Sequence, residues 1–257
     1  MNAKTPKLTV VGAGPGDVEL ITLKAIKAIE SADVILYDAL INEDLLKYAS
    51  KDVELIFVGK RKGYFSYMQE QINELIVDRA KNCGHVVRLK GGDPFIFGRG
   101  AEEIDYAREF DIETYTVPGI SSVIAVPEYQ GIPLTKRGVS RSFWVMTGTT
   151  KSHKLSSDVT LAAKSSATIV ILMGMHKLDE IVKIFSKENK ENTPVAIIQD
   201  GTTENEKFGF GTISTIRKVV EEQQLSTPAI IVIGEVVKER VVLSSLYKDV
   251  KENIAKR

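Results

Sequence analysis

The sequence predicts an α/β protein with two domains whose sheets are mixed and largely parallel. Short β-branched runs alternate with glycine turns and segments of helical period, which is typical of sheets covered by helices. The chain has 257 residues, enough for one large domain or two modest ones. Because the pattern restarts after Pro118, we expect an N-terminal α/β domain over residues 1–118 and a C-terminal α/β domain over residues 119–257.

The first half alternates predicted strands with predicted helices. It opens with a strand at Leu8–Val11, then a glycine loop, then a helix at Val18–Glu30 whose apolar residues recur at helical spacing. Further strands are expected at residues 33–37, 53–58, 85–89 and 112–117, with helices at residues 67–81 and 101–110. These strands would form one sheet.

Five more strands are predicted in the second half, at residues 142–146, 167–172, 194–199, 207–211 and 229–233. An alternative domain boundary is the polar stretch of residues 147–157. That boundary would separate the first of these strands from the other four, so the boundary at Pro118 is preferred.

Composition excludes several classes of protein. Apolar residues make up 43% and charged residues 26%, as in ordinary globular domains, and 34 lysines and arginines balance 34 acidic residues. A net charge of zero gives no general attraction to nucleic acid or to a membrane surface. The apolar runs are far shorter than the roughly 18 residues of a membrane span, and no signal-peptide pattern opens the chain, so we expect a cytoplasmic enzyme. One cysteine and three scattered histidines predict no disulfide and no metal site.

Ligands of open α/β sheets bind at the carboxyl ends of the strands, so the loops after strands are candidate sites. The first such loop runs from Gly12 to Asp17 with the glycine spacing GxGxG, not the GxGxxG of dinucleotide-binding loops. Pro15 has no N–H group to offer a pyrophosphate. Taken alone, the loop is either a tight turn or part of a ligand site, and its spacing argues against an NAD-dependent oxidoreductase.

The segment from Arg88 to Gly100 carries a stronger signal. It places four glycines and three cations around the carboxylate of Asp93. Consecutive glycines let a ligand approach the backbone, and Asp93 is kept out of the helical conformation by Pro94. The alternative is a loop that only caps the following helix.

Three groups of cations indicate a basic rim, two of them at the ends of predicted strands and the third after the segment of residues 131–135. A cationic run between two glycines usually lies on a solvated face, but three such groups at one sheet edge would form a basic mouth. That mouth would suit a polyanionic small molecule, because arginine pairs with carboxylates in bidentate fashion and lysine acts as a point charge. The groups are Lys60, Arg61 and Lys62; Arg88, Lys90 and Arg99; and Lys136, Arg137 and Arg141.

Two second-half segments also end strands at glycines. Met173, next to Gly174, either lines a pocket or belongs to the core, and the segment of residues 199–203 is either a simple turn or part of a site.

Collinear motifs over essentially the whole chain resemble the tetrapyrrole methylase family. Shared segments are Val11-Gly-Ala-Gly-Pro-Gly-Asp17, Leu89-Lys-Gly-Gly-Asp-Pro94, Pro118-Gly-Ile-Ser-Ser122, Leu172-Met-Gly174 and Thr227-Pro-Ala229. Segments that resemble the members acting on uroporphyrinogen III are Tyr37-Asp-Ala-Leu40, Gly59-Lys-Arg-Lys-Gly63 with Gln71-Ile-Asn73, Phe95-Ile-Phe-Gly-Arg-Gly100 and Gly131-Ile-Pro-Leu-Thr135. Ala39 stands where arginine is frequent in the family, which removes one cation from the predicted rim.

The resemblance implies two α/β domains with a deep cleft between them, and a homodimer. It implies S-adenosyl-L-methionine bound folded in that cleft, with S-adenosyl-L-homocysteine as product and no metal. Carried over by position, the methyl donor would contact Pro15, Gly91, Gly92, Asp93, Ile96, Ser121, Ser122, Met173, Gly201 and Ala229.

The resemblance also implies the reaction. The substrate would be uroporphyrinogen III, methylated at two β-pyrrole carbons to give precorrin-2 via precorrin-1. Asp38 would act as proton acceptor and Lys60 as proton donor, while the eight carboxylates of the substrate would meet Arg61, Lys62, Arg99 and Lys136. Neither nucleic acid nor a membrane is expected as a partner.

Several alternatives remain at this stage. A later precorrin methyltransferase of the cobalamin pathway would have the same fold, as would relatives that act on diphthamide or ribosomal RNA. The cationic run at residues 60–62 favours the uroporphyrinogen III reaction, and zero net charge weakens the case for RNA. A non-catalytic tetrapyrrole or nucleotide carrier would bind without releasing S-adenosyl-L-homocysteine.

Overall fold

The computed structural model describes residues 4–59 and 67–241. The predicted rim residues Lys60, Arg61 and Lys62 lie outside these ranges. The chain divides into two units, one ending at Ser122 and the other beginning at Val123.

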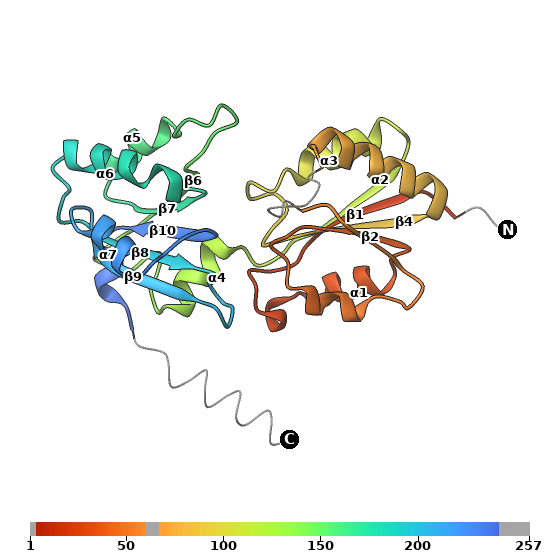
Figure 1. Cartoon of the computed structure of the whole chain (residues 1–257), viewed down its shortest axis with the longest axis horizontal. Coiled ribbons are helices and arrows are strands. Elements are labelled where there is room, and N and C mark those ends of the chain that lie inside the picture. The colour runs from red at the N-terminus through yellow and green to blue at the C-terminus, as the bar shows by residue number, and fades with distance from the viewer. Residues whose placement is uncertain (1–3, 60–66, 242–257) are drawn as a thin grey trace, which may run out of the picture. The chain divides into compact units, whose positions relative to one another are not determined.

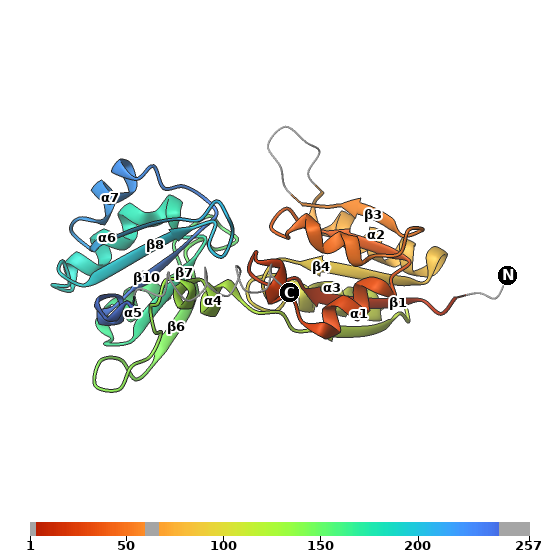
Figure 2. The same cartoon turned by 90° about the horizontal axis from the view of Figure 1, so that it is seen from below.

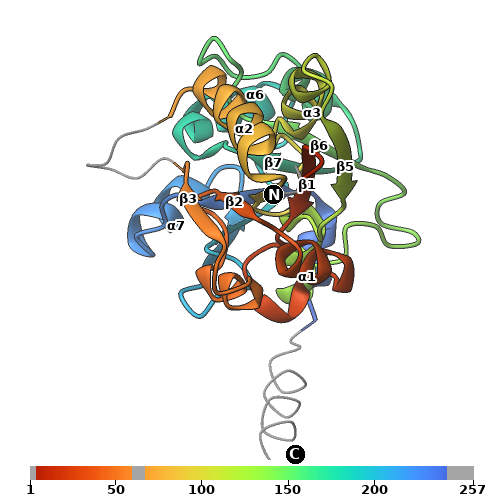
Figure 3. The ribbon, with the colours of Figure 1, turned by 90° about the vertical axis from the view of Figure 1, so that its right-hand side faces the viewer.

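The first unit is built on a parallel sheet with helices on both faces (Figures 1 and 3). The strands are β1 (Lys7–Gly12), β2 (Val34–Tyr37), β3 (Glu54–Phe57), β4 (His85–Lys90) and β5 (Glu113–Val117), in the order β3-β2-β4-β1-β5. Figure 2 shows β3 at the border of this sheet. All its pairings are parallel, so the carboxyl ends of the strands, and the loops that follow them, meet at one edge.

The central strands β1, β2 and β4 are buried on both faces, which explains why they are rich in apolar residues, whereas the border strands β3 and β5 are partly exposed. Leu8 and Val10 of β1 pack toward α2 (Gln69–Cys83) and α3 (Gly100–Arg108), whereas Val11 packs toward α1 (Leu23–Glu30) on the other face. Side chains of a strand alternate between the two faces of a sheet. The alternation sends Arg88 and Lys90 of β4 to the same face, because they are two residues apart.

The first helix is shorter than its apolar pattern predicts. Residues Val18–Leu20 form a 3₁₀ turn, and α1 begins only at Leu23. The Thr22 hydroxyl accepts a hydrogen bond from Ala25 N (3.1 Å) and caps the helix. The expected single helix over Val18–Glu30 is therefore wrong at its start, because Asp17 and Thr22 each cap a separate element.

The second unit contains a mixed sheet in the order β6-β7-β10-β8-β9. Its strands are β6 (Phe143–Thr147), β7 (Thr168–Leu172), β8 (Pro194–Gln199), β9 (Lys207–Thr212) and β10 (Ala229–Ile233). β6 and β7 are parallel, whereas β10 runs antiparallel to β7 and β8, and β9 antiparallel to β8. The mixed, largely parallel α/β class is thus confirmed, with most of the parallel pairings in the first unit.

Helices also cover both faces of the second sheet. α5 (Asp158–Lys164), α6 (Leu178–Lys187) and α7 (Ile216–Glu222) pack through Val159, Phe185 and Ile216 on one face. On the other face lie α4 (Ser122–Tyr129), through Val123 and Val126, and a 3₁₀ segment, η4 (Glu235–Glu239).

Candidate functional site

The loops at the carboxyl edge of the first sheet pack backbone against backbone. A Cβ atom placed on Gly119 would lie 2.2 Å from Gly92 O, and one placed on Gly12 would lie 2.5 Å from Gly119 Cα. Ala13 N donates to Lys90 O (2.7 Å), and Gly92 N donates to Gly14 O (2.7 Å). The glycines therefore let the loops after β1, β4 and β5 form one continuous surface.

Asp93 joins two of these loops. Its Oδ2 accepts a hydrogen bond from Gly119 N (3.1 Å) and its Oδ1 accepts one from Phe95 N (2.9 Å). These bonds fix the segment before Ser121 and Ser122, both of which are half-buried. An ionised carboxylate has about four acceptor sites, so these two bonds leave Asp93 able to accept from a ligand.

The predicted cofactor residues of the first unit lie on this loop surface. Gly92 has a φ of +65°, and the nearest neighbours of an added Cβ there would be Ser122 N (3.8 Å) and Ser121 Cα (3.9 Å). Glycine at this position thus leaves a space in front of the two serines. Pro15 is half-buried in the loop after β1, and Ile96 is exposed.

The second unit brings three predicted cofactor residues to one edge of its own sheet. Met173 directly follows β7 with a φ of +55° and is 50% exposed. Gly201 follows β8, and Ala229 begins β10 opposite Gln199, the last residue of β8. Because β10 is antiparallel to both neighbours, its start lies beside their ends. The pocket-lining alternative for Met173, a half-exposed strand-end residue, is thus favoured over a core position.

Two residues at this edge, Met173 and Asp200, have left-handed backbone conformations, which are strained in residues other than glycine. The Thr149 hydroxyl donates to the carbonyl of Met173 (2.9 Å), which holds its left-handed conformation. Asp200 N donates to Pro228 O (3.0 Å), and Asp200 also has a positive φ, +48°. An added Cβ on Gly201 would lie 2.5 Å from Val126 Cγ1, so only glycine fits there.

Asp38 lies at the end of β2 and belongs to a charged cluster. Its Oδ1 accepts a hydrogen bond from Arg88 Nη2 (2.5 Å), and its Oδ2 lies 3.8 Å from Lys90 Nζ. The side chain of Asp38 is 27% exposed, whereas those of Arg88 and Lys90 are almost completely buried. The cluster therefore leads from the interior to a half-exposed carboxylate.

The expectation that Arg88 and Lys90 belong to an exposed rim is wrong. Both face the buried carboxylate of Glu103 on α3, with Arg88 Nε and Lys90 Nζ at 3.1 and 2.9 Å from its Oε1. Burial alone would lower the pKa of the Arg88 guanidinium, but Glu103 and Asp38 outweigh it and raise that pKa. Burial, followed by the like charge of Arg88, lowers the pKa of the Lys90 ammonium.

Sequence reasoning missed Glu103. It stands beside Glu102 in a helix, where two acidic residues read as an ordinary solvated first turn. The available signal was the pair of cations at alternate positions of a buried strand, because buried charges need partners.

Two predicted substrate residues within the described ranges, Arg99 and Lys136, are more exposed. Arg99 lies at the start of α3 and forms a bidentate ion pair with Glu102, with Nη2 at 2.5 Å from Oε2. This hydrogen-bonded pair raises the pKa of Arg99. Lys136, in the second unit, forms an ion pair with Glu239. Exposed pairs are weak, so a carboxylate ligand can compete for both cations.

Exposed apolar side chains surround Asp38 and Arg99 in sequence. Leu40 is 63% exposed and lies beside Gly91, where an added Cβ would be 3.0 Å from Leu40 Cβ. Phe95, Ile96 and Phe97 are also exposed. The loops after β2 and β4 thus combine charged groups with apolar surface.

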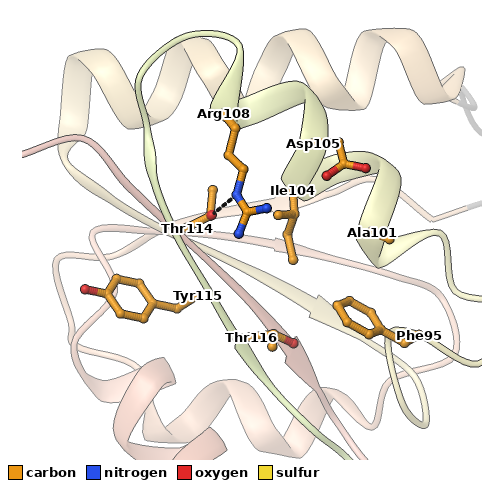
Figure 4. Close-up of a pocket in the computed structure, with 8 residues that line it drawn as sticks. All are labelled: Phe95, Ala101, Ile104, Asp105, Arg108, Thr114, Tyr115 and Thr116. Atoms are coloured by element: carbon orange, nitrogen blue, oxygen red, sulfur yellow. Dashed lines mark hydrogen bonds between the residues drawn. The ribbon is translucent and has the colours of Figure 1, made fainter.

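A separate hollow of about 340 Å³ lies between α3 and β5 (Figure 4). Arg108 crosses it and donates from Nε to Thr114 Oγ1 (2.9 Å). Among the described residues, this hollow shares only Phe95 with the loop of residues 91–100 and is lined by none of the predicted site residues.

Within the described ranges, no group of three or more histidine, cysteine or acidic side chains is placed to hold a metal ion. In the same part of the chain, no helix has both the length and the apolar character needed to cross a bilayer.

Comparison with known proteins decides the family. Residues 7–217 match the family model described as tetrapyrrole (corrin/porphyrin) methylases. The chain belongs to this family. The resemblance inferred from the motifs is therefore confirmed.

Similar proteins carry related names. The chain is 50% identical over 235 residues to a uroporphyrinogen-III C-methyltransferase of Methanocaldococcus jannaschii, covering 91% of this chain and 97% of that relative. It is 46% identical to the enzyme of the same name from Priestia megaterium, covering 90% and 98%. A siroheme synthase of Pectobacterium atrosepticum is 41% identical over 93% of this chain but only 51% of its own length.

Solved structures agree with the fold. A uroporphyrin-III C-methyltransferase from Thermus thermophilus in complex with S-adenosyl homocysteine aligns with a TM-score of 0.77 and 33% identity, over 90% of this chain and 99% of its own. A cobalt precorrin-4 methyltransferase aligns with a TM-score of 0.80 and 26% identity, over 90% and 95%.

Proposed function

We propose that the chain methylates uroporphyrinogen III at two β-pyrrole carbons with S-adenosyl-L-methionine, to give precorrin-2 via precorrin-1. The observation that carries the proposal is 50% identity over nearly the whole length of a relative named for this reaction. The geometry supports it, because a loop surface of glycines adjoins a half-exposed carboxylate and exposed apolar side chains.

The described residues fit a bound S-adenosyl-L-methionine. Gly92 leaves the space in front of Ser121 and Ser122 free of a side chain, since an added Cβ would stand 3.8 Å from Ser122 N and 3.9 Å from Ser121 Cα. On the first unit, the binding residues would be Pro15, Gly91, Gly92, Asp93, Ile96, Ser121 and Ser122; on the second unit they would be Met173, Gly201 and Ala229. When bound, this cofactor supplies an electrophilic methyl group on a sulfonium.

The chain's own contribution to methyl transfer is mainly positioning. A β-pyrrole carbon is already nucleophilic, so no protein nucleophile is required, and alignment of the reacting carbons provides most of the acceleration. Exposed Leu40 and Phe95 offer apolar surface to the macrocycle, and Arg99 offers a bidentate partner to one of its carboxylates. Arg61, Lys62 and Lys136 would bind further carboxylates.

Asp38 would accept the proton that leaves the macrocycle after methylation. Methyl transfer leaves the ring system positively charged, and loss of a proton restores its neutrality. Asp38 Oδ1 is held by Arg88, which leaves Oδ2 as the less encumbered oxygen. Lys60 stands at the position to which the resemblance assigns the proton donor, and we propose that role for it.

Incubation with uroporphyrinogen III and S-adenosyl-L-methionine tests the proposal. We expect two added methyl groups by mass spectrometry and two equivalents of S-adenosyl-L-homocysteine. Asp38→Asn should slow methylation while binding S-adenosyl-L-homocysteine as tightly as the unmodified chain. Binding of both ligands without any methyl transfer would show that the chain is a carrier and would refute the proposed methyltransferase activity.

A later precorrin methyltransferase is the second candidate. The fold is compatible with it, because a cobalt precorrin-4 methyltransferase aligns with a TM-score of 0.80 at 26% identity. Methylation of a precorrin but not of uroporphyrinogen III in the same assay would select this alternative.

We also propose that the chain is a homodimer, which light scattering of the purified protein would test.

A further inference from the structure

Four ionisable side chains of the first unit, Asp38 among them, form a continuous cluster. Two are cations of β4, Arg88 and Lys90, and two are anions, Asp38 after β2 and Glu103 on α3. The charges balance within the cluster. Its side chains become more exposed in one direction, from 0% at Glu103 through 2% at Arg88 to 27% at Asp38.

Glu103 is the hub of this cluster. Its Oε1 accepts hydrogen bonds from Arg88 Nε (3.1 Å), Lys90 Nζ (2.9 Å) and Gln69 Nε2 (3.1 Å). Within residues 4–59 and 67–241, its Oε2 is buried without a hydrogen-bond partner. Glu103 thus accepts all its hydrogen bonds through one oxygen, at the point where both cations meet.

The guanidinium of Arg88 is fixed on each side. Nε is held by Glu103, Nη1 donates to Leu36 O (3.3 Å) and Leu89 O (3.2 Å), and Nη2 donates to Asp38 Oδ1 (2.5 Å). A planar group held by its other nitrogens presents the last one in a single direction. That direction determines where the Asp38 carboxylate points.

Stability alone gives no reason for this arrangement. The cluster lies against an apolar core that includes Val86, Leu36 and Ile104, and well-packed apolar residues in place of buried ion pairs are often as stable or more stable. A buried hub with one half-exposed carboxylate at its end is the arrangement expected of a device that orients that carboxylate.

We propose that Glu103 is a positioning residue that acts through Arg88 and Lys90 to orient the Asp38 carboxylate for proton acceptance. The inference rests on the proposed function of Asp38. In that step a bond between the macrocycle and hydrogen breaks, its electron pair remains in the ring system, and the proton bonds to an Asp38 oxygen. Glu103 touches neither substrate nor cofactor.

Glu103→Gln tests the proposal in the full chain. It keeps the size of the side chain but removes the charge that holds both cations. We expect kcat for uroporphyrinogen III methylation to fall by about 10- to 100-fold, since small misplacement of a catalytic group has effects of this order. KM and the Kd for S-adenosyl-L-homocysteine should stay within about twofold of the original, because no binding contact is lost.

A matched control and a partial rescue accompany this variant. Asp105→Asn removes one negative charge from the same helix at an exposed position outside the cluster and should leave kcat unchanged. Glu103→Asp keeps the charge on a shorter side chain, so its kcat should lie between those of Glu103→Gln and the original.

A double-mutant comparison separates positioning from general damage. If Glu103 acts only through Asp38, adding Glu103→Gln to Asp38→Asn should change the single-turnover rate by less than twofold. If Glu103→Gln lowers the rate of Asp38→Asn as much as it lowers the rate of the chain with Asp38 intact, its role is merely structural and the proposal is overturned. Unchanged kcat in folded Glu103→Gln would overturn it as well.

A charge-matched variant covers the case in which Glu103→Gln does not fold. Glu103→Leu combined with Lys90→Met removes one charge of each sign and keeps the Arg88–Asp38 pair. We expect a Tm close to the original with kcat reduced at least about 10-fold; a folded variant with full kcat would refute the role of Glu103. If the original chain does not methylate uroporphyrinogen III, the proposed function fails first, and that result is distinct from each of these.

Discussion

At Gly119 the backbone leaves no room for a methyl group. The nearest atom to an added Cβ is Gly92 O, at 2.2 Å, and Gly92 belongs to the predicted cofactor surface. Gly119→Ala should lower the free energy of unfolding by about 1–3 kcal/mol through overpacking, as measured by urea titration. It should also weaken binding of S-adenosyl-L-homocysteine, measured by calorimetry, because Gly92 must move.

Gly138→Ala is the matched control for this change. Gly138 has a φ of +83°, and no atom of the described residues lies within 4 Å of an added Cβ there. This variant should cost only the strain of the left-handed conformation, about 1–2 kcal/mol, and leave ligand binding intact. Unaltered binding by Gly119→Ala would show that the loop packing does not shape the site.

His85 makes the stability of the first unit depend on pH. Its Nε2 lies 2.8 Å from Thr9 Oγ1, and its Nδ1 lies 2.9 Å from Ser31 O. Burial, and then the charge of Lys7, lower the pKa of His85 below 6.5, against the opposing effects of Ser31 and Asp33. The neutral ring is therefore favoured in the folded state.

The sign of the pH effect follows from linkage. The unfolded chain binds a proton at His85 more readily than the folded chain. The contribution of His85 to the free energy of unfolding should therefore be fully present above pH 6.5, and the free energy of unfolding should decrease as the pH falls below that value. Urea titrations at several pH values should show this decrease, and His85→Gln should flatten it. His153 is exposed, so His153→Gln is the control and should leave the slope unchanged. An equally steep slope in His85→Gln would contradict the assignment.

At the scale of elements, one hydroxyl defines where α1 begins. Thr22 accepts a hydrogen bond from Ala25 N, so the helix starts after it although the apolar pattern extends farther back. Thr22→Ala should lower the free energy of unfolding by about 1 kcal/mol, measured by urea titration, while Thr22→Ser keeps the cap and should have little effect. Equal losses in both variants would point to packing of the threonine methyl instead of capping.

Strand β4 shows how one element serves two purposes. Its odd positions, Val87 and Leu89, pack toward α1, while Val86 contributes to the core beneath α2 and α3. Arg88 and Lys90 continue the second face and meet Glu103 there. The same alternation that makes β4 a buried strand thus delivers two cations to the region below Asp38.

For the whole molecule, a net charge of zero makes any electrostatic attraction of substrate local. A basic rim should therefore be sensitive to salt, because the Debye length falls from about 10 Å at 0.1 M to about 3 Å at 1 M. We expect KM for uroporphyrinogen III to rise with salt in steady-state assays, with little change in the Kd for S-adenosyl-L-homocysteine. Lys60→Ala should weaken substrate more than cofactor and reduce the dependence on salt; a KM independent of salt would contradict the basic rim.

Local pattern was sufficient for most of the secondary structure. The ten expected strands correspond to β1–β10 with shifts of one residue or less at most ends, because buried runs and glycine turns are local properties. The family was also visible in the sequence, since its motifs are short and collinear. The roles predicted for Asp38, Lys60 and the cofactor residues remain predictions.

The sequence by itself determined the strands, the turns between them and the family. Only the tertiary structure decided which way β10 runs in its sheet, and that Arg88 and Lys90 are buried against Glu103 instead of exposed. The physical reason is that strand formation depends on neighbouring residues, whereas the environment of a charge depends on what a distant helix places beside it. Thirteen residues separate Lys90 from Glu103 along the chain, yet their charged atoms are 2.9 Å apart in the fold.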